Sequence, residues 1–485
     1  MTRTAPDDAA PPPSRTLPGT PSAPVAETGR APVRLAAPAP GDVVAAVRGR
    51  QVLVDGVLRP ATLHVSDGRI TAVDAYDAPV DGPALTAPDH AYVLPGVVDT
   101  HVHVNEPGRT AWEGFATATR AAALGGVTTL VDMPLNSIPP TTTPSGLAAK
   151  RRAATGQLSV DVALWGGAVP GNLDDLRPLW EAGVMGFKCF LSPSGVDEFP
   201  PVGPAAFDAA LRTVAAFDGL VIVHAEDPRV LADAPVRPGG DYRDFVASRP
   251  HAAETAAIAR VVAGARETGC RVHVLHLSSA RALDLLADAR AEGLPVTVET
   301  CPHYLTFDAD AIPHASTAHK CCPPIRDAGN REALWDGLLE GIIDVVVTDH
   351  SPATAQEKLR GDGDLQQAWG GVAGLQVGFQ AVAHGAAARG IGVAQVSRWM
   401  ATSTAELVGL PHKGRLAPGA DADVLVLDPQ VPVRVDARTL AHRNPISAYD
   451  GVELSASVTG TVLRGRVVAR DGAVTAGTGR LLRRP

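Results

Sequence analysis

Eight short apolar runs alternate with amphipathic stretches, and this alternation limits the fold more than any other feature of the chain. Each run has the length of a buried strand, and the intervening stretches, such as residues 110–126 and 251–269, have helical periodicity. Eight β/α repeats over about 270 residues are typical of a TIM-like (β/α)8 barrel. An open doubly wound sheet would instead place a glycine-rich phosphate turn after the first strand, and none is present there. The predicted strands are residues 96–103, 127–134, 158–164, 184–190, 220–226, 271–278, 296–301 and 344–350.

Two regions outside the predicted barrel have the pattern of short β-strands. Residues 43–75 contain alternating apolar runs broken by Asp-Gly turns, and residues 421–474 have the same texture. Neither region can bury an apolar face alone, so we expect the two to pair into one small β-sandwich. The predicted organisation is a disordered Pro/Ala-rich tail at 1–41, a composite β-sandwich from 42–94 and 412–485, and a barrel at 95–411.

Composition excludes several classes of function. The formal net charge of -9 argues against a nucleic-acid or anionic-membrane surface. No run of 18 apolar residues is present, and the chain begins without the apolar region of a secretory signal. An odd number of cysteines without a CxxC pair fits a reduced, cytoplasmic protein better than a disulfide framework. The five cysteines are Cys189, Cys270, Cys301, Cys321 and Cys322.

Five of the eight predicted strands end on a residue that can bind a metal. The first ends in His-Val-His, and two histidines at alternate positions of a strand point to the same face. The fourth contains a lysine between apolar neighbours, where an ammonium group is unfavourable unless it is paired or chemically altered. Each residue alone has an ordinary explanation, such as a core histidine or a helix cap. Together at one end of a barrel they predict a metal site formed by His101, His103, Lys188, His224, His276 and Asp349.

The two-residue period of a strand also indicates which of the remaining histidines face the predicted site. His273 and His276 differ by three positions and face opposite sides, and His276 lies nearer the end of its strand. His350 faces away from Asp349 for the same reason. His303 follows a strand without a partner ligand, so we expect it to have a supporting or structural role.

The motifs resemble those of the cyclic amidohydrolases of the amidohydrolase superfamily, which include allantoinases, hydantoinases and dihydroorotases. The resemblance extends over nearly the whole chain from about residue 43 onward. It rests on residues 95–115, 125–141, 186–195, 223–227, 273–279, 301–305, 321–327, 348–352, 368–376 and 413–423.

The resemblance assigns a role to each candidate ligand. It makes His101 and His103 ligands of a first metal ion, and His224 and His276 ligands of a second. Lys188 matches a lysine that reacts with carbon dioxide to give N6-carboxylysine, an anionic group that bridges both ions. Asp349 matches a ligand of the first ion. Histidine, carboxylate and carbamate donors suit zinc, and also cobalt, manganese or iron.

The resemblance also implies a mechanism. A hydroxide activated by the two ions attacks the ring amide, and Asp349 carries its proton to the leaving nitrogen. A scaffold protein with this fold is a second class of candidate. Such proteins lose metal ligands, whereas all six matching positions are intact here, which favours an enzyme.

Substrate choice depends on the loops after the first two strands. Dihydroorotases carry an arginine that holds a substrate carboxylate at the position of Asn105, and a neutral asparagine cannot supply that charge. Arg109 lies four residues further on and keeps dihydroorotase activity open, beside hydantoinase (dihydropyrimidinase) activity. The segments around Asn105 and 132–136 are most similar to allantoinases, so we expect hydrolysis of allantoin to allantoate. The resemblance further implies a homotetramer acting on this small molecule, with substrate contacts at Asn136, Cys322, Gly370 and Gly371.

Overall fold

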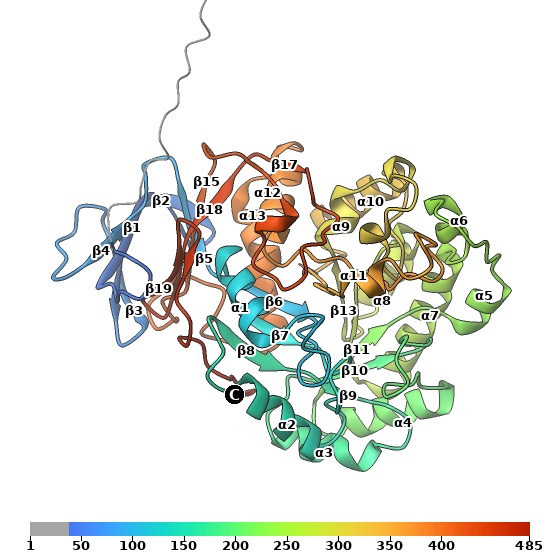
Figure 1. The fold of residues 1–485 in the computed structure, drawn as a ribbon. Helices are drawn as coiled ribbons and strands as arrows, with labels where there is room; N and C mark the ends of the chain where they lie inside the picture. Colours follow the sequence, from blue (N-terminus) through green and yellow to red (C-terminus); the bar gives the residue numbers. More distant parts are fainter. Residues whose placement is uncertain (1–37) are drawn as a thin grey trace, which may run out of the picture. The chain divides into compact units, whose positions relative to one another are not determined.

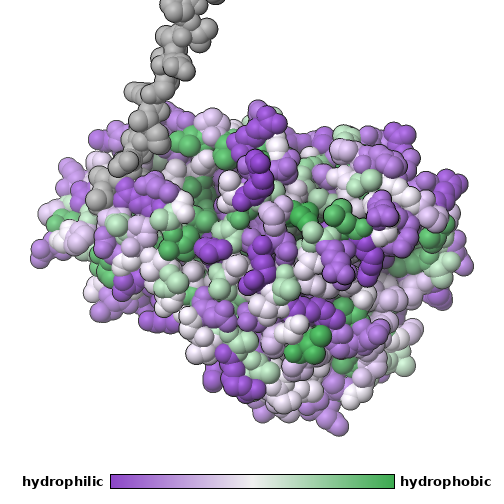
Figure 2. Space-filling model, viewed as in Figure 1, coloured by the Kyte–Doolittle hydropathy of each residue, from purple (hydrophilic) through white to green (hydrophobic). Residues whose placement is uncertain are grey.

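The computed structural model describes residues 38–485, so the predicted tail lies almost entirely outside the described residues. A parallel barrel and a mixed, mostly antiparallel sheet are the main parts of the described chain (Figure 1). Hydrophilic residues cover most of the face shown in Figure 2, and hydrophobic ones form small separate groups on it. Among the described residues, no helix has the length and apolar character needed to cross a membrane.

The barrel strands follow the predicted order. Strands β6 to β8 form one parallel sheet and β9 to β14 form another. The N–H of Met185 donates to the carbonyl of Leu164 at 3.0 Å, and the N–H of His103 donates to the carbonyl of His350 at 2.8 Å. These bonds join the two sheets at both edges, and the predicted (β/α)8 barrel is confirmed. The strands are β6 Val97–Val102, β7 Val127–Asp132, β8 Asp161–Leu164, β9 Gly166–Gly167, β10 Phe187–Phe190, β11 Leu220–His224, β12 Arg271–Val274, β13 Val296–Thr300 and β14 Val345–Val346.

Helices surround the barrel in the connections between strands (Figure 1). The stretch at 110–126 becomes helical only from Phe115, because Gly114 has a φ of 143° that ends the preceding loop. The helices are α1 Phe115–Leu124, α2 Pro144–Ala154, α3 Leu173–Glu181, α4 Pro204–Ala215, α5 Pro228–Asp233, α6 Tyr242–Ala247, α7 His251–Thr268, α8 Leu283–Ala291, α9 Pro302–Thr306, α10 Ala328–Leu339, α11 Ala355–Lys358, α12 Gly378–Ala387, α13 Val393–Ser397 and α14 Ser403–Leu407. Short 3-10 turns lie at η1 Ala280–Ala282, η2 Ala309–Ala311, η3 Thr317–His319 and η5 Ala437–Thr439, and a π turn lies at η4 Arg398–Thr402.

The second sheet combines strands from both ends of the described chain, which lie side by side in Figure 1. Its centre is the antiparallel pairing of β5 with β15, and apolar side chains of both halves, such as Leu63 and Val426, share one core. The predicted composite β region is therefore present. The strands are β1 Ala46–Val54, β2 Val57–Ser66, β3 Arg69–Asp74, β4 Ala84–Thr86, β5 Tyr92–Pro95, β15 Val424–Asp428, β18 Ser457–Leu463, β19 Arg466–Arg470 and β20 Ala473–Val474, with a separate hairpin of β16 Val433–Arg434 and β17 Glu453–Leu454.

A buried cluster of charges joins the barrel to the segment that enters β15. The Lys413 amine lies 2.8 Å from a carboxylate oxygen of Asp161 in β8, 2.9 Å from one of Asp421 and 2.7 Å from one of Asp423. Three carboxylates that are this close could hold a cation, and here the ammonium group of Lys413 fills that role. Removal of one partner from a buried ion pair is costly because the remaining charge is left unpaired.

Lys413→Met is therefore expected to lower the free energy of unfolding by about 3–5 kcal/mol at neutral pH. Burial already raises the pKa of Asp423, and without the ammonium this pKa would rise further above its unfolded value. The folded variant then takes up protons more readily than the unfolded chain, so the deficit shrinks as pH falls towards 5. Urea unfolding at pH 8 and pH 5.5 measures both effects.

Arg438→Met is the control, because Arg438 pairs with Asp436 at an exposed site and its loss should leave the unfolding midpoint unchanged. Equal unfolding midpoints for Lys413→Met and the wild type would show that the cluster does not stabilise the fold.

Candidate metal centre and active pocket

The first part of the site is fixed where β6 and β14 end. His101 lies in β6, His103 follows that strand directly, and Asp349 follows β14. The buried carboxylate of Asp99 accepts hydrogen bonds from the N–H groups of His101 and Thr348, both at 3.2 Å, and from the Thr348 hydroxyl at 2.5 Å. Asp99 therefore holds the two strand ends in register, a role that the sequence analysis did not identify.

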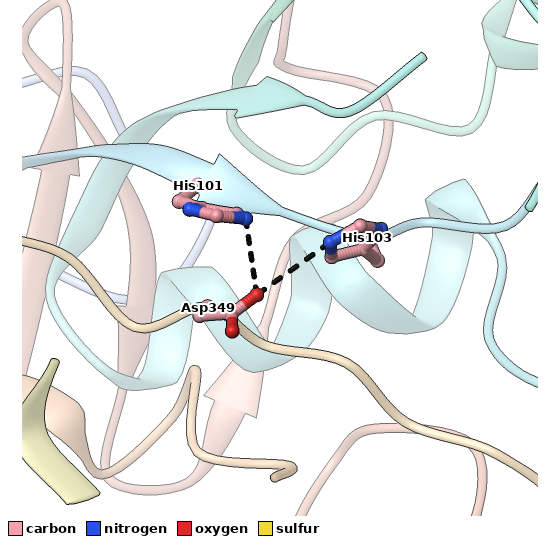
Figure 3. A group of neighbouring side chains, drawn as sticks. All are labelled: His101, His103 and Asp349. Atoms are coloured by element: carbon pink, nitrogen blue, oxygen red, sulfur yellow. Dashed lines mark ion pairs between the residues drawn. The ribbon is translucent and has the colours of Figure 1, made fainter. Parts of the chain in front are cut away.

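His101, His103 and Asp349 converge on one point (Figure 3). An Asp349 carboxylate oxygen lies 3.0 Å from Nε2 of His101 and 3.5 Å from Nε2 of His103. The backbone of Asp349 has a φ of 44°, a left-handed conformation that is uncommon outside glycine and is concentrated at functional sites. The three buried donors lie close enough together to bind one metal ion.

A second histidine pair lies at the ends of β11 and β12. Nδ1 of His224 lies 3.0 Å from Nε2 of His276, and His276 is also left-handed, with a φ of 36°. His273, by contrast, contacts Glu299 and does not line the pocket. The distinction between His273 and His276 drawn from strand period thus matches their positions. Both His224 and His276 are buried, with two nitrogen atoms directed at each other and available for a shared ion.

Lys188 in β10 lies against the first group, with its amine nitrogen 3.3 Å from Nε2 of His101. Only 1% of the residue is exposed, and burial lowers the pKa of its amine to about 8. Burial likewise lowers the pKa of His103 to about 3. These shifts favour a neutral imidazole, which can bind a metal, and increase the fraction of neutral amine, which can react with carbon dioxide.

Two buried carboxylates contact the candidate ligands from behind. Glu299 of β13 accepts from Nδ1 of His101 at 2.5 Å and from His273 at 3.0 Å. Glu226 lies 2.8 Å from Nε2 of His224 and 2.5 Å from Arg249. The carboxylates thereby leave Nε2 of His101 and Nδ1 of His224 directed towards the other candidate ligands. Sequence reasoning missed both, although a lone glutamate in the apolar run 296–301 was a usable signal.

Glu299 places a buried negative charge directly behind His101. Although burial favours its neutral form, the imidazole of His101 and the hydrogen bonds from both histidines hold the pKa of Glu299 well below its usual range. Its partners are imidazoles rather than lysine or arginine. A metal ion at His101 would compensate this charge, so the residues present fit the metals that the resemblance implies.

All four predicted substrate contacts line one pocket of about 270 Å³, together with every candidate ligand except His101. The amide nitrogen of Asn136 lies 3.4 Å from Nδ1 of His103, so its side chain supports that histidine. Cys322 is partly buried, and its thiol faces the position of Gly370. Cationic side chains at the pocket include Arg249, Lys320 and Arg360.

The loop residues that bear on substrate choice lie outside this pocket. Arg109 forms an ion pair with Glu198 and donates to the carbonyl of Asn136 at 3.0 Å. Asn105 is buried, and its amide donates to the carbonyl of Pro352 at 3.3 Å. Because the charge of Arg109 is already paired away from the pocket lining, it is poorly placed to hold a substrate carboxylate.

His303, Gly370 and Gly371 are the remaining residues that the sequence analysis singled out. His303 is fully buried with both ring nitrogens unpartnered among the described residues, close to Cys301 and Asp349. Gly371 has a φ of 125°, and a side chain there would collide with the Ser351 carbonyl at 2.3 Å. The glycine is required by this close approach of two loops.

A (β/α)8 barrel whose strand ends carry clustered histidines, a carboxylate and a buried lysine defines a metal-dependent type of hydrolase site. The sequence pattern of the Amidohydrolase family matches residues 92–468. The chain belongs to the amidohydrolase family, whose members generally bind divalent metals.

Two named relatives that are similar to this chain over most of its length are allantoinases. The chain is 53% identical to the allantoinase of Streptomyces avermitilis over 91% of its length and 99% of that protein. It is 42% identical to the allantoinase of Saccharomyces cerevisiae over 87% of its length and 95% of that protein. These relatives, with the family, show that the chain is a hydrolase of cyclic amides.

Solved structures agree on the fold. The L-hydantoinase (dihydropyrimidinase) from Arthrobacter aurescens matches with a TM-score of 0.84 and 31% identity, covering 90% of this chain and 99% of that one. A D-hydantoinase matches with a TM-score of 0.82 and 25% identity over 91% of this chain and 98% of that one. The shared fold extends across the barrel and the composite sheet.

Proposed function

We propose that this protein hydrolyses the hydantoin ring amide of allantoin to give allantoate. The observation that carries the proposal is the pocket, which brings five of the six candidate ligands together with the predicted substrate contacts. Arg109 is paired with Glu198 outside the pocket, and the two arginines that line it, Arg249 and Arg360, are paired with Glu226 and Glu357. Allantoin has no carboxylate, whereas dihydroorotate has one. The allantoinase relatives support the same choice over the hydantoinases, which are less similar in sequence.

The proposed centre holds two divalent ions, most simply zinc, with cobalt, manganese or iron as chemically suitable replacements. One ion would be held by His101, His103 and Asp349. The other would be held by His224 and His276. Lys188, as N6-carboxylysine, would bind both ions. Bound ions of this kind supply Lewis acidity and make a water molecule more acidic.

Asp349 is proposed to move the proton. The carboxylate accepts a proton from the attacking water and donates it to the ring nitrogen as the amide bond breaks. Ser351 donates to one of its oxygens at 3.0 Å and so orients the carboxylate. Asn136, Cys322, Gly370 and Gly371 are proposed to contact the substrate from the pocket wall.

The organisation of the protein is part of the same proposal. The composite β-sandwich is assigned to 42–94 and 412–485 and the barrel to 95–411, with the tail preceding residue 42. A cytoplasmic homotetramer is proposed, since the chain resembles enzymes with that assembly.

Side-by-side assays of allantoin, dihydroorotate and hydantoin test the activity, with metal content measured on the same sample. Preferential conversion of allantoin with about two metal ions per chain is the expected outcome. Preference for either other substrate would overturn the substrate assignment, and a metal-free active enzyme would overturn the mechanism.

Glu299→Gln tests the metal centre without changing any of the candidate ligands. Loss of the charge behind His101 is expected to weaken metal affinity about 10–100-fold. Competition with a chelator of known affinity measures this change independently of turnover.

Glu254→Gln serves as the matched control, because Glu254 is an equally buried glutamate that instead pairs with Arg326 at 2.7 Å. That control should lose stability but keep its metal affinity. An unchanged affinity in Glu299→Gln would contradict a metal ion at His101.

A further inference from the structure

All five lysines of the chain are buried, with at most 7% of any one exposed. Lys188 lies in the candidate metal centre, and Lys150 and Lys413 pair with aspartates. Lys320 and Lys358 are different, because no carboxylate pairs with either amine among the described residues. A buried amine is unfavourable unless its donors are satisfied, so their partners are informative.

The partners of both amines are carbonyl groups of one short segment, residues 366–371. Lys320 donates to the carbonyls of Gln366, at 3.2 Å, and Ala368. Lys358 donates to the carbonyls of Trp369, at 3.1 Å, and Gly371. Four of six consecutive carbonyls are therefore bound by two lysines. Burial lowers the pKa of Lys358 to about 7, and either protonation state retains the two donors needed.

The same segment is one wall of the active pocket. Gln366, Ala368, Trp369, Gly370 and Gly371 all line it, as does Lys320 itself. The segment contains no helix or strand, so regular hydrogen bonding does not determine its shape. Additional bonds fix it to both lysine-bearing segments: the N–H of Gly371 donates to the Lys320 carbonyl at 2.7 Å, and that of Trp369 to the Glu357 carbonyl at 3.0 Å.

One backbone donor of this wall is left for a ligand. The carbonyls of 366, 368, 369 and 371 are bound by the lysines, and the N–H groups of Trp369 and Gly371 have acceptors. Within the described part of the chain, the N–H of Gly370 has no acceptor. Allantoin carries carbonyl oxygens on its ring and on its ureido group, and a fixed backbone N–H is a suitable donor to them.

We propose that Lys320 and Lys358 are positioning residues that hold segment 366–371 in the shape that binds the substrate. The amines bind the carbonyl groups of the segment and leave the Gly370 N–H available to a substrate carbonyl. Neither lysine takes part in the chemical step. The statement that the Gly370 N–H binds a substrate carbonyl rests on the proposed function. The statement that the two lysines order the segment does not.

Lys320→Met and Lys358→Met test the inference, since methionine keeps much of the volume but donates no hydrogen bond. Each variant is expected to raise KM for allantoin at least about tenfold while kcat changes less than about threefold. Metal content should remain that of the wild type. Amide hydrogen exchange should accelerate in residues 366–371 without accelerating in the barrel strands.

Lys413→Met is the matched control, a buried lysine remote from the pocket lining that should lose stability with KM unchanged. A wild-type KM in both test variants, or faster exchange throughout the barrel, would overturn the inference. A wild type that does not convert allantoin would instead overturn the proposed function, and hydrogen exchange would still decide whether the lysines order the segment.

Discussion

Lys188→Ala is expected to reduce kcat for allantoin by at least about 10³-fold, because the bridge between the two proposed metal ions is lost and with it the activated nucleophile. Metal content should fall in parallel. A methyl group also leaves space beside His101 that the lysine side chain now fills. Added acetate or propionate should enter this space and restore part of the metal binding and the activity.

Rescue by a carboxylic acid separates this explanation from simple misfolding, because a damaged barrel would not recover on addition of a small anion. Acetamide, a neutral molecule of the same shape as acetate, is the control and should not restore activity. Retention of two tightly bound metals and full activity in Lys188→Ala would refute carboxylation of this lysine.

Asp349→Asn is expected to lower kcat about 10²–10⁴-fold, since an amide retains an oxygen that can bind a metal but cannot accept the proton of the attacking water. The effect should fall on kcat more than on KM. Steady-state kinetics on samples of measured metal content would separate lost proton transfer from lost metal.

Ser351→Ala is the companion variant, because Ser351 only donates to an Asp349 oxygen at 3.0 Å. It should retain most of the activity and its metals. Wild-type kcat in Asp349→Asn with intact metals would move the proton transfer to another group, for which His303 is a buried candidate near Asp349.

Strand period explains why much of the site could be predicted from sequence. His101 and His103 share a face because alternate residues of a strand do, and His276 was separated from His273 by the same rule. Lys188 was recognisable because a lysine between buried apolar residues needs a chemical explanation. The same reasoning applied to Glu299 would have revealed the carboxylate behind His101.

Irregular segments explain what could not be predicted. Lys320 and Lys358 are 38 positions apart in the chain and meet on segment 366–371, which has no period to place it. The last strand was predicted at 344–350, but β14 ends at Val346 because the chain turns at Thr348 and Asp349 to enter the pocket. Hydrogen bonds between distant loops decide both features.

Burial of every lysine determines how the folded protein reacts with amine-directed reagents. Its exposed cationic side chains are arginines and histidines, so acylating dyes, activated-ester resins and amine cross-linkers find no accessible ε-amine on the folded surface. Unfolding exposes all five amines at once. The rate of lysine acylation therefore reports opening of the molecule, and immobilisation through carboxylates preserves the native state better than coupling through lysine side chains.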